Sequence, residues 1–339
     1  LTMFKRMMIR SVSGLLSGFA LLSAAAVAAP PPSLALPPAA AIPTPAASAA
    51  ASPASLEPPP GYRPPPKTLE RIAQRGAIYV AHREASIPFS YTDDEGRVHG
   101  YSWELCMRIV DAVKARLNQP SIEVVPVFAT SSSRIMMVES GVVDLYCGSS
   151  TNTEQWARYV SFSNTYFVAG VKGLVRKDSG IRSVEDLKGR TVVTTAGTTS
   201  DGYVKGATAR RNIFVNLRTA RTHGDAFNEV LGGKADVFVL DDILLKGLLA
   251  NSSQADAYKL VILDESFGFE PYGLMLRKGD PEFKRIVDET LLGLCRSGEI
   301  ERIYAKWFQS AIPPKGINLD LPMGPELKQL IKTPNDRGI

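Results

Sequence analysis

The stretch GVVDLYC at residues 141–147 sets the pattern of the chain, because a similar stretch, GKADVFV, recurs at residues 233–239. In both, a Gly that ends a helix opens a Gly-x-x-Asp sequence, and an apolar run typical of a buried strand follows. Five residues past each Asp lie Ser149 and Asp241, just beyond the carboxyl ends of the two strands. Open α/β sheets bind ligands at that edge. The repetition therefore predicts two α/β lobes with a cleft between them.

The apolar residues around these stretches alternate between strand and helix periods, so the predicted fold class is α/β. We expect strands at 77–81, 122–127, 142–147, 191–195 and 236–240, and helices at 69–75, 102–117, 134–139 and 226–231. Further helices are expected to start at Ser183, with Gly189 as the stop, and after Ser200. Ser102 is expected to N-cap the helix that it begins.

The first 66 residues differ in composition from the rest. Residues 1–28 combine three basic residues, a short apolar run and the sequence Ala26-Val27-Ala28, a pattern typical of a secretory signal peptide. Residues 29–66 are dominated by Pro and Ala, and we expect an extended, disordered tether there. Cleavage near Ala28 is expected to leave an exported chain that does not insert into the membrane.

Composition and motifs argue against several function classes. The formal charge of +5 includes three basic residues of the signal segment, which leaves +2 for the exported chain and gives no support for nucleic-acid binding. The sequence has no G-x-S-x-G or H-E-x-x-H motif and no His/Cys cluster, so we expect no catalytic residue, metal or cofactor. Export permits a disulfide among Cys106, Cys147 and Cys295, but buried apolar thiols are the favoured interpretation.

Two arginines and one loop could hold an anion. Arg83 directly follows a strand, and Arg134 follows the hydroxyl-rich run TSSS at residues 130–133. A guanidinium with neighbouring hydroxyls can bind a carboxylate bidentately, although either Arg alone is also typical of a solvated surface. The sequence GTTS at residues 197–200 precedes a helix, whose first N–H groups are unpaired and positive. It lacks the Gly-Lys of a nucleotide P-loop.

His223 and Asp241 are the other polar candidates. No further His or Cys lies at ligand spacing from His223, which argues against a metal site. His223 is interpreted either as a hydrogen-bond donor to an anion or as part of a surface turn. Asp241, at a strand end, could hold an ammonium group or could N-cap the next helix.

Six segments carry a resemblance to a known family: HREASIPFSY at 82–91, CGSSTN at 147–152, GTTS at 197–200, HGD at 223–225, DD at 241–242 and IPPK at 312–315. Together they resemble the glutamate/aspartate-binding proteins of bacterial ABC importers, which are solute-binding proteins of the polar amino acid type. The similarity runs collinearly from about Thr68 to the C-terminus. It implies the two-lobed, type II periplasmic-binding-protein (Venus-flytrap) fold.

The resemblance also implies how the chain is divided. Two crossover strands are expected to form the hinge, near Ala169 and near Pro271. Lobe 1 is then expected to comprise residues 67–169 plus 271–339, and lobe 2 residues 170–270.

A ligand-binding set follows from the same resemblance. The residues expected to hold a side-chain carboxylate are Arg83, Ser131, Arg134 and His223. Those expected in the cradle for the α-carboxylate and amino group are Ser149, Thr151, Thr198 and Thr199, the last two through their backbone. Asp241 is expected to be the partner of the ammonium group.

Trp156 departs from the family pattern. In the family, an Arg that binds the α-carboxylate lies seven residues after the position of Ser149 and six residues before that of Phe162. In this sequence both counts lead to Trp156, and the nearest Arg is Arg158. Loss of such a charge-assisted contact costs about 1.5–3 kcal/mol. Arg158 could reach in from a rearranged turn, the ligand could lack an α-carboxylate there, or Trp156 could stack on a different ligand. Altered specificity is favoured over loss of binding.

The function implied is that of a monomeric periplasmic protein without a cofactor, which delivers an acidic amino acid or a related dicarboxylate to an ABC importer permease. Two other classes remain open. An enzyme on the same scaffold would use His223 and Glu154 as acid and base, but nothing in the sequence orients either residue. A sensory or scavenging module would use the tether to attach to an envelope component.

Overall fold

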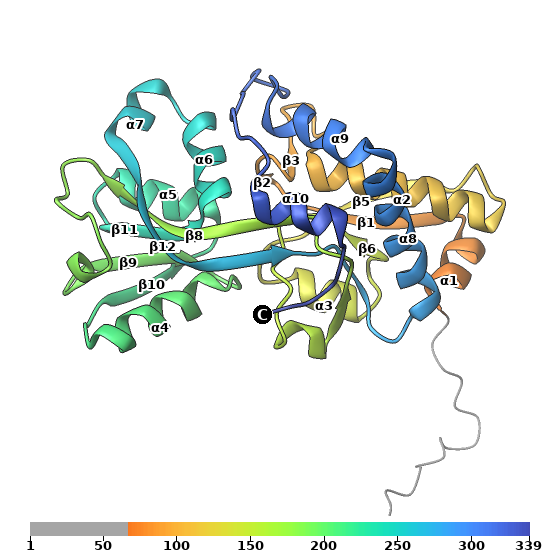
Figure 1. Cartoon of the computed structure of the whole chain (residues 1–339), viewed down its shortest axis with the longest axis horizontal. Helices are drawn as coiled ribbons and strands as arrows, with labels where there is room; N and C mark the ends of the chain where they lie inside the picture. Colours follow the sequence, from red (N-terminus) through yellow and green to blue (C-terminus); the bar gives the residue numbers. More distant parts are fainter. Residues whose placement is uncertain (1–66) are drawn as a thin grey trace, which may run out of the picture. The chain divides into compact units, whose positions relative to one another are not determined.

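The computed structural model describes residues 67–339, so the predicted signal peptide at 1–28 and tether at 29–66 lie outside the described residues. Within this part, helices cover the faces of two five-stranded sheets (Figure 1). The helices are α1 (Thr68–Arg75), α2 (Tyr101–Leu117), α3 (Arg134–Glu139), α4 (Ser200–Arg211), α5 (His223–Leu231), α6 (Asp242–Asn251), α7 (Gln254–Lys259), α8 (Pro281–Ser297), α9 (Glu299–Phe308) and α10 (Pro325–Lys332). Two 3-10 turns, η1 (Trp156–Arg158) and η2 (Glu185–Leu187), accompany them.

The first sheet has the order β5-β1-β6-β13-β7. Its strands are β5 (Glu123–Phe128), β1 (Ala77–His82), β6 (Leu145–Tyr146), β13 (Met275–Arg277) and β7 (Val160–Phe162). β1 pairs in parallel with β5 and β6, whereas β13 pairs antiparallel with β6 and β7. β13 follows the second sheet along the chain, so the C-terminal segment returns to the first sheet.

The second sheet has the order β10-β9-β11-β8-β12. Its strands are β10 (Asn216–Ala220), β9 (Thr191–Thr195), β11 (Val237–Asp241), β8 (Phe167–Arg176) and β12 (Leu260–Tyr272). β9 pairs in parallel with β10 and β11, and β8 pairs antiparallel with β11 and β12. A small antiparallel sheet of β2 (Ala85–Ser86), β3 (Ser90–Thr92) and β4 (Val98–His99) precedes α2.

The repeated Gly-x-x-Asp stretch provides the central strand of each five-stranded sheet, β6 and β11. The Asp plays the same part in both. Asp144 donates its N–H to Tyr79 O (2.8 Å) and accepts from Tyr79 N–H through Oδ2 (2.8 Å). Asp236 makes the same pair of bonds with Thr191, also at 2.8 Å. A short acceptor side chain thus fixes where each central strand starts against its neighbour.

β8 and β12 are long, and they connect the two sheets, running side by side across the described part (Figure 1). Ala169 and Pro271, where the hinge is expected, lie on these strands, and Ala169 pairs with Glu270. The rings of Phe89, Phe167, Tyr272 and Phe308 pack together at their ends, with centroids 4.8–5.7 Å apart. Such pairs each contribute about 0.5–1.5 kcal/mol beyond burial. The lobe boundaries themselves stay a prediction.

Three local expectations differ from the structure. The helix expected from Ser183 is the single turn η2, because Asp186 accepts from the N–H groups of Arg182 and Ser183 and holds a turn instead. The N-cap of α2 is Gly100, and the Ser102 hydroxyl donates to Phe89 O (2.7 Å). The strand expected at 142–147 shortens to β6.

A disulfide joins Cys106 of α2 to Cys147, which begins the loop after β6. The expectation of buried free thiols is therefore wrong for these two residues. Both are fully buried, and 41 residues separate them, a distance over which sequence patterns give no pairing signal. Cys295 is a free, half-buried thiol. No helix of residues 67–339 combines the length and the apolar character needed to cross a membrane.

Replacing both disulfide cysteines by alanine is expected to lower the free energy of unfolding by about 2–4 kcal/mol, because the unfolded chain regains the entropy of an open loop. Urea denaturation under non-reducing conditions measures this. The single variant Cys295→Ala is the control and should change the midpoint much less. A double variant as stable as the wild type would contradict the prediction.

Candidate functional site

A small cavity lies beyond the carboxyl ends of β1, β6, β9 and β11. Its lining residues come from two halves of the described part, one built on the first five-stranded sheet and the other on the second. Its volume is about 10 Å³, room for about one water molecule, so a larger ligand would need the lining to move apart. The lining residues are Arg83, Ser131, Arg134, Ser149, Thr151, Thr198, Thr199, His223, Leu240, Asp241 and Leu244. Nine of the eleven residues proposed from the sequence therefore lie together, and Trp156 and Arg158 do not belong to this lining.

Arg134, the first residue of α3, is buried and holds a fixed position. Its Nε donates to Ser150 Oγ (3.0 Å), and its Nη1 donates to Gly197 O (3.1 Å) and to the Ser131 carbonyl. Burial lowers the pKa of Arg134 to about 10, so the guanidinium stays charged at neutral pH. The bond to Gly197 reaches the segment after β9, and Ser132 Oγ donates to neighbouring Ala196 O (3.2 Å). These two contacts join the halves.

Arg83 lies beside Arg134 in the lining and directly follows β1. Its backbone N–H donates to Ser90 Oγ (2.9 Å), and its Nη1 donates to the Tyr146 hydroxyl (3.4 Å). Neither guanidinium has a carboxylate within salt-bridge distance among residues 67–339. Two buried cations without a counter-ion are costly, and an anionic ligand would compensate them.

Two hydroxyl groups of the lining lack partners. Ser131 Oγ and Ser149 Oγ are buried and make no hydrogen bond within the described part. An unpaired buried hydroxyl costs about 1–3 kcal/mol, and native proteins keep few of them. Both atoms therefore indicate a polar ligand.

The half with β9 and β11 supplies a neutral imidazole and a helix end. Burial, followed by the positive charges of Arg83 and Arg134, lowers the pKa of His223 well below its usual value. The neutral ring contacts Thr195 Oγ1 through Nδ1 (2.8 Å) and can donate from one nitrogen. Thr199 is the N-cap of α4, and its side chain does not cap, so the first N–H groups of the helix remain available to an anion.

Asp241 is the acid of the lining, and the structure argues against one of its two sequence interpretations, the N-cap. It occupies the N-cap position of α6, yet its side chain makes no capping bond. Instead Oδ2 accepts from the Tyr272 hydroxyl. Its carboxyl is thus available to a ligand.

Sequence reasoning missed Glu270, a fully buried carboxyl on β12 that accepts from Thr151 Oγ1 (2.6 Å). The stretch FGFEPYGLML at residues 267–276 indicates a buried acid, because it holds a single carboxyl group in an otherwise apolar run. A charged residue inside such a strand is rarely left buried unless it has a partner.

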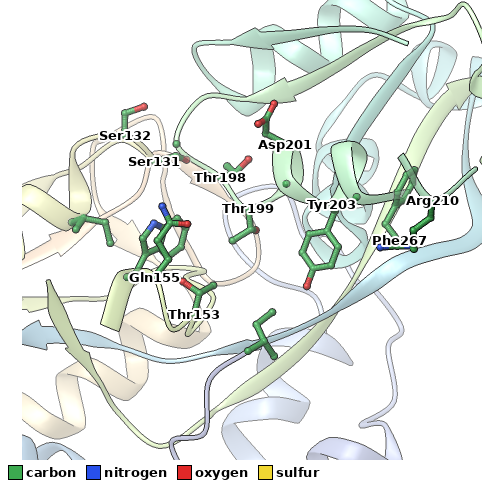
Figure 2. A pocket seen from close by; sticks show the side chains of 16 residues that line it. Ser131, Ser132, Thr153, Gln155, Thr198, Thr199, Asp201, Tyr203, Arg210 and Phe267 are labelled. Carbon is green, nitrogen blue, oxygen red and sulfur yellow. Dashed lines mark hydrogen bonds between the residues drawn. The ribbon is translucent and has the colours of Figure 1, made fainter. Parts of the chain in front are cut away.

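Trp156 lies beside the cavity, in a wide groove that shares Ser131, Thr198 and Thr199 with the cavity lining. The Arg134 guanidinium stacks on its indole ring, 4.6 Å from the centroid. In Figure 2, Thr198, Thr199 and Tyr203 line the α4 side of this groove, and Thr153 and Gln155 come from the segment before η1. Arg158 lines neither space. Arg158 does not reach in, which removes the first of the three interpretations of Trp156.

The sequence of residues 78–310 matches the family of bacterial extracellular solute-binding proteins, family 3. The chain belongs to this family. A Pseudomonas aeruginosa L-glutamate/L-aspartate-binding protein is 44% identical over 271 residues, 80% of this chain and 89% of the relative. An Escherichia coli glutamate/aspartate import solute-binding protein is 39% identical over 272 residues, with the same coverage.

Solved structures of amino-acid-binding proteins agree on the fold. An ancestral arginine-binding protein bound to arginine aligns with a TM-score of 0.60 at 30% identity, over 69% of this chain and 99% of that one. The fold is accordingly the mixed α/β, two-domain periplasmic-binding-protein fold expected from the sequence, and the chain is a solute-binding protein rather than an enzyme.

Gly197→Ala is expected to hinder closure of the cleft. Gly197 has φ +76°, and a Cβ there would lie 2.7 Å from Ser132 Cα and 2.8 Å from Ser131 O, on the other half. We expect a larger radius of gyration in small-angle X-ray scattering, with and without glutamate, the ligand in the relatives' names.

Gly180→Ala is the matched control. Gly180 has φ +75°, so alanine suffers the same backbone strain, but nothing lies within 4 Å of its added Cβ. If both variants scatter like the wild type, the close approach at Gly197 does not control closure.

Proposed function

We propose that the chain binds an acidic amino acid, glutamate or aspartate, in the cavity and delivers it to the permease of an ABC importer. The observation that carries this is the pattern of buried charge. Arg83 and Arg134, which have no carboxylate within salt-bridge distance in residues 67–339, share one small cavity with Asp241. A molecule with carboxylates and an ammonium group complements that pattern. The relatives at 39–44% identity are named for glutamate and aspartate.

Each lining residue receives a proposed role from its chemistry. Arg83, Arg134, Ser131 and neutral His223 hold the side-chain carboxylate. Ser149 and Thr151, with the backbone of Thr198 and Thr199 at the start of α4, hold the α-carboxylate and part of the amino group. Asp241 binds the ammonium. These contacts come from both halves, so a bound ligand stabilises the closed cleft over the open one.

The remaining proposals concern the setting of the protein. Signal cleavage near Ala28 would release a monomer into the periplasm. The lobes would be 67–169 plus 271–339 and 170–270, and would move about a hinge near Ala169 and Pro271. No cofactor takes part in this function.

Ligand-linked stabilisation tests the proposal. A ligand at one hundred times its Kd raises the free energy of unfolding by about 2.7 kcal/mol. We expect glutamate or aspartate to raise the melting temperature, glutarate (which has no ammonium) to raise it less, and lysine to leave it unchanged. The proposal loses its basis if no acidic amino acid or small dicarboxylate shifts the transition at millimolar concentration.

Trp156 is the feature that favours a modified specificity within this function. The indole lies against Arg134, and no guanidinium from residues 156–158 lines the cavity. The α-carboxylate would then be bound by hydroxyl and N–H groups without a third Arg. A ligand with an uncharged or differently placed group at this end, such as another small dicarboxylate, is the alternative that this observation supports.

Trp156→Arg is expected to raise the affinity for glutamate by roughly tenfold to a hundredfold, because a charge-assisted bond adds about 1.5–3 kcal/mol. Isothermal titration calorimetry measures the change. The Trp156→Leu variant removes the ring without adding a charge, so its affinity shows how much of the change comes from loss of the ring alone. An Arg variant that binds no better than the Leu variant would contradict the expected clamp.

A further inference from the structure

The wide groove beside the cavity has a lining of which most takes no part in the ligand contacts proposed above. Its volume is about 820 Å³, which is within the range of small-molecule sites and far larger than the cavity. Ser131, Thr198 and Thr199 line both spaces, so an atom held at these residues lies where the cavity meets the groove. A ligand bound in the cavity can therefore extend into the groove.

One face of α4 forms a wall of the groove (Figure 2). Along this helix the wall residues follow one another at intervals of three or four positions: Thr199, Tyr203, Gly206 and Arg210. This spacing places them on one side of the helix, and a rise of 1.5 Å per residue makes the wall about 16 Å long. An extended peptide needs at most about 3.6 Å per residue, so the groove has room for a few residues.

The groove is lined mainly by neutral groups. Its charged side chains are Asp201, which pairs with Lys205 (2.7 Å), and Arg210. The neutral side chains include aromatic, hydroxyl and amide groups, from Trp156, Tyr203, Phe267, Thr153 and Gln155. Such a lining offers apolar contact together with a few hydrogen bonds. It suits a neutral peptide chain better than a charged group.

Trp156 is the groove residue that lies against a cavity residue, since the Arg134 guanidinium is 4.6 Å from the centroid of its ring. An indole face carries partial negative charge and attracts cations rather than anions. It supplies no positive charge to a carboxylate, whereas a neutral amide can pack against it. The groove therefore disfavours a free carboxylate on the part of a ligand that enters it.

The two carboxyl groups of an acidic amino acid differ in what they need from the site. Arg83 and Arg134 have no carboxylate within salt-bridge distance in residues 67–339, so they need the charged side chain of the ligand. The α-carboxyl is assigned to hydroxyl and N–H groups, which also bind the carbonyl oxygen of an amide. An amide at the α-carboxyl thus removes no ion pair. An amide at the side chain would leave two buried cations uncompensated.

We propose that the groove is a second subsite, and that the preferred ligand is a short peptide whose N-terminal residue is glutamate or aspartate. The side-chain carboxylate and the free ammonium group bind in the cavity. The first peptide carbonyl lies at the start of α4, and the following residue lies in the groove beside Trp156. This inference rests on the proposed function, because it keeps the same contacts for the acidic residue and names what its α-carboxyl is joined to.

Calorimetric titration of the wild type with matched ligands tests this substrate class. The dipeptide Glu-Ala and the α-amide of glutamate keep the acidic side chain and the ammonium group, but their glutamate unit has no α-carboxylate. We expect Glu-Ala to bind at least about tenfold more tightly than glutamate, and the α-amide to bind more tightly than glutamate as well. The dipeptide γ-Glu-Ala, which is linked through the side-chain carboxyl, should bind more weakly than Glu-Ala.

The Gly202→Leu variant tests the groove separately from the cavity. Gly202 lines the groove but not the cavity, and an added Cβ there has nothing within 4 Å, so leucine occupies groove space without a clash. We expect Glu-Ala to lose about tenfold or more in affinity, and glutamate less than about threefold. The readout is the ratio of the two affinities, since a general effect on closure changes both by one factor.

Gly293→Leu is the matched control. Gly293 lies within a helix, α8, and an added Cβ there also has nothing within 4 Å, but it lines neither the groove nor the cavity. This variant should keep the wild-type ratio of affinities. Circular dichroism melts establish that each variant is folded.

Three results would overturn the inference and leave the proposed function in place. They are glutamate binding as tightly as Glu-Ala, γ-Glu-Ala binding more tightly than Glu-Ala, and equal losses for glutamate and Glu-Ala in the Gly202→Leu variant. If the wild type binds none of these ligands, the proposed function fails first and takes this inference with it.

Discussion

β8 and β12 pair from the Arg176–Leu260 end to the Phe167–Tyr272 end, with register shifts between Ile262 and Gly268. At the second end, β12 also holds the loop that follows β6, because the backbone of residues 150–152 pairs with that of residues 271–273. The same strand therefore carries part of the second sheet and fixes the loop of Ser149 and Thr151. Glu270 lies on this strand as well. The position of the site depends on this pairing more than on any single lining residue.

The chain buries Arg and Asp side chains in two different ways. Asp144 is fully buried and receives ion pairs from Arg71 (2.9 Å) and Arg75 together with a backbone N–H, so its charge is compensated inside the protein. The guanidinium groups of Arg83 and Arg134 bond to carbonyl and hydroxyl groups instead. The first arrangement is complete as folded, whereas the second leaves both guanidinium groups without a carboxylate partner among residues 67–339, a partner that we propose the ligand supplies. This contrast distinguishes structural from functional buried charge more clearly than residue type does.

Much of the fold and site followed from local pattern. The Gly-x-x-Asp stretches predicted two of the strands and placed Ser149 and Asp241 at the edge where ligands bind, because open α/β sheets bind ligands beyond their strand ends. The full set of lining residues followed from the family resemblance. The Cys106–Cys147 disulfide and the hydrogen bond between Thr151 and Glu270 were not predictable in the same way. Both depend on contacts between segments far apart in sequence, which periodicity does not encode. The position of Trp156 outside the cavity depended on the path of η1, which is set by packing rather than by spacing.

The contacts of Arg134 with Gly197 and of Ser132 with Ala196 join the halves without the help of a ligand. Such contacts stabilise the closed form in the absence of a ligand, and the apparent Kd equals the intrinsic Kd divided by the share of molecules that are closed. A change confined to these bridging contacts rescales the affinity for every ligand by one common factor. Changes at Asp241 or Arg83 alter the ratios between ligands. Different groups of atoms in the cleft thus determine its overall affinity and its preference among ligands.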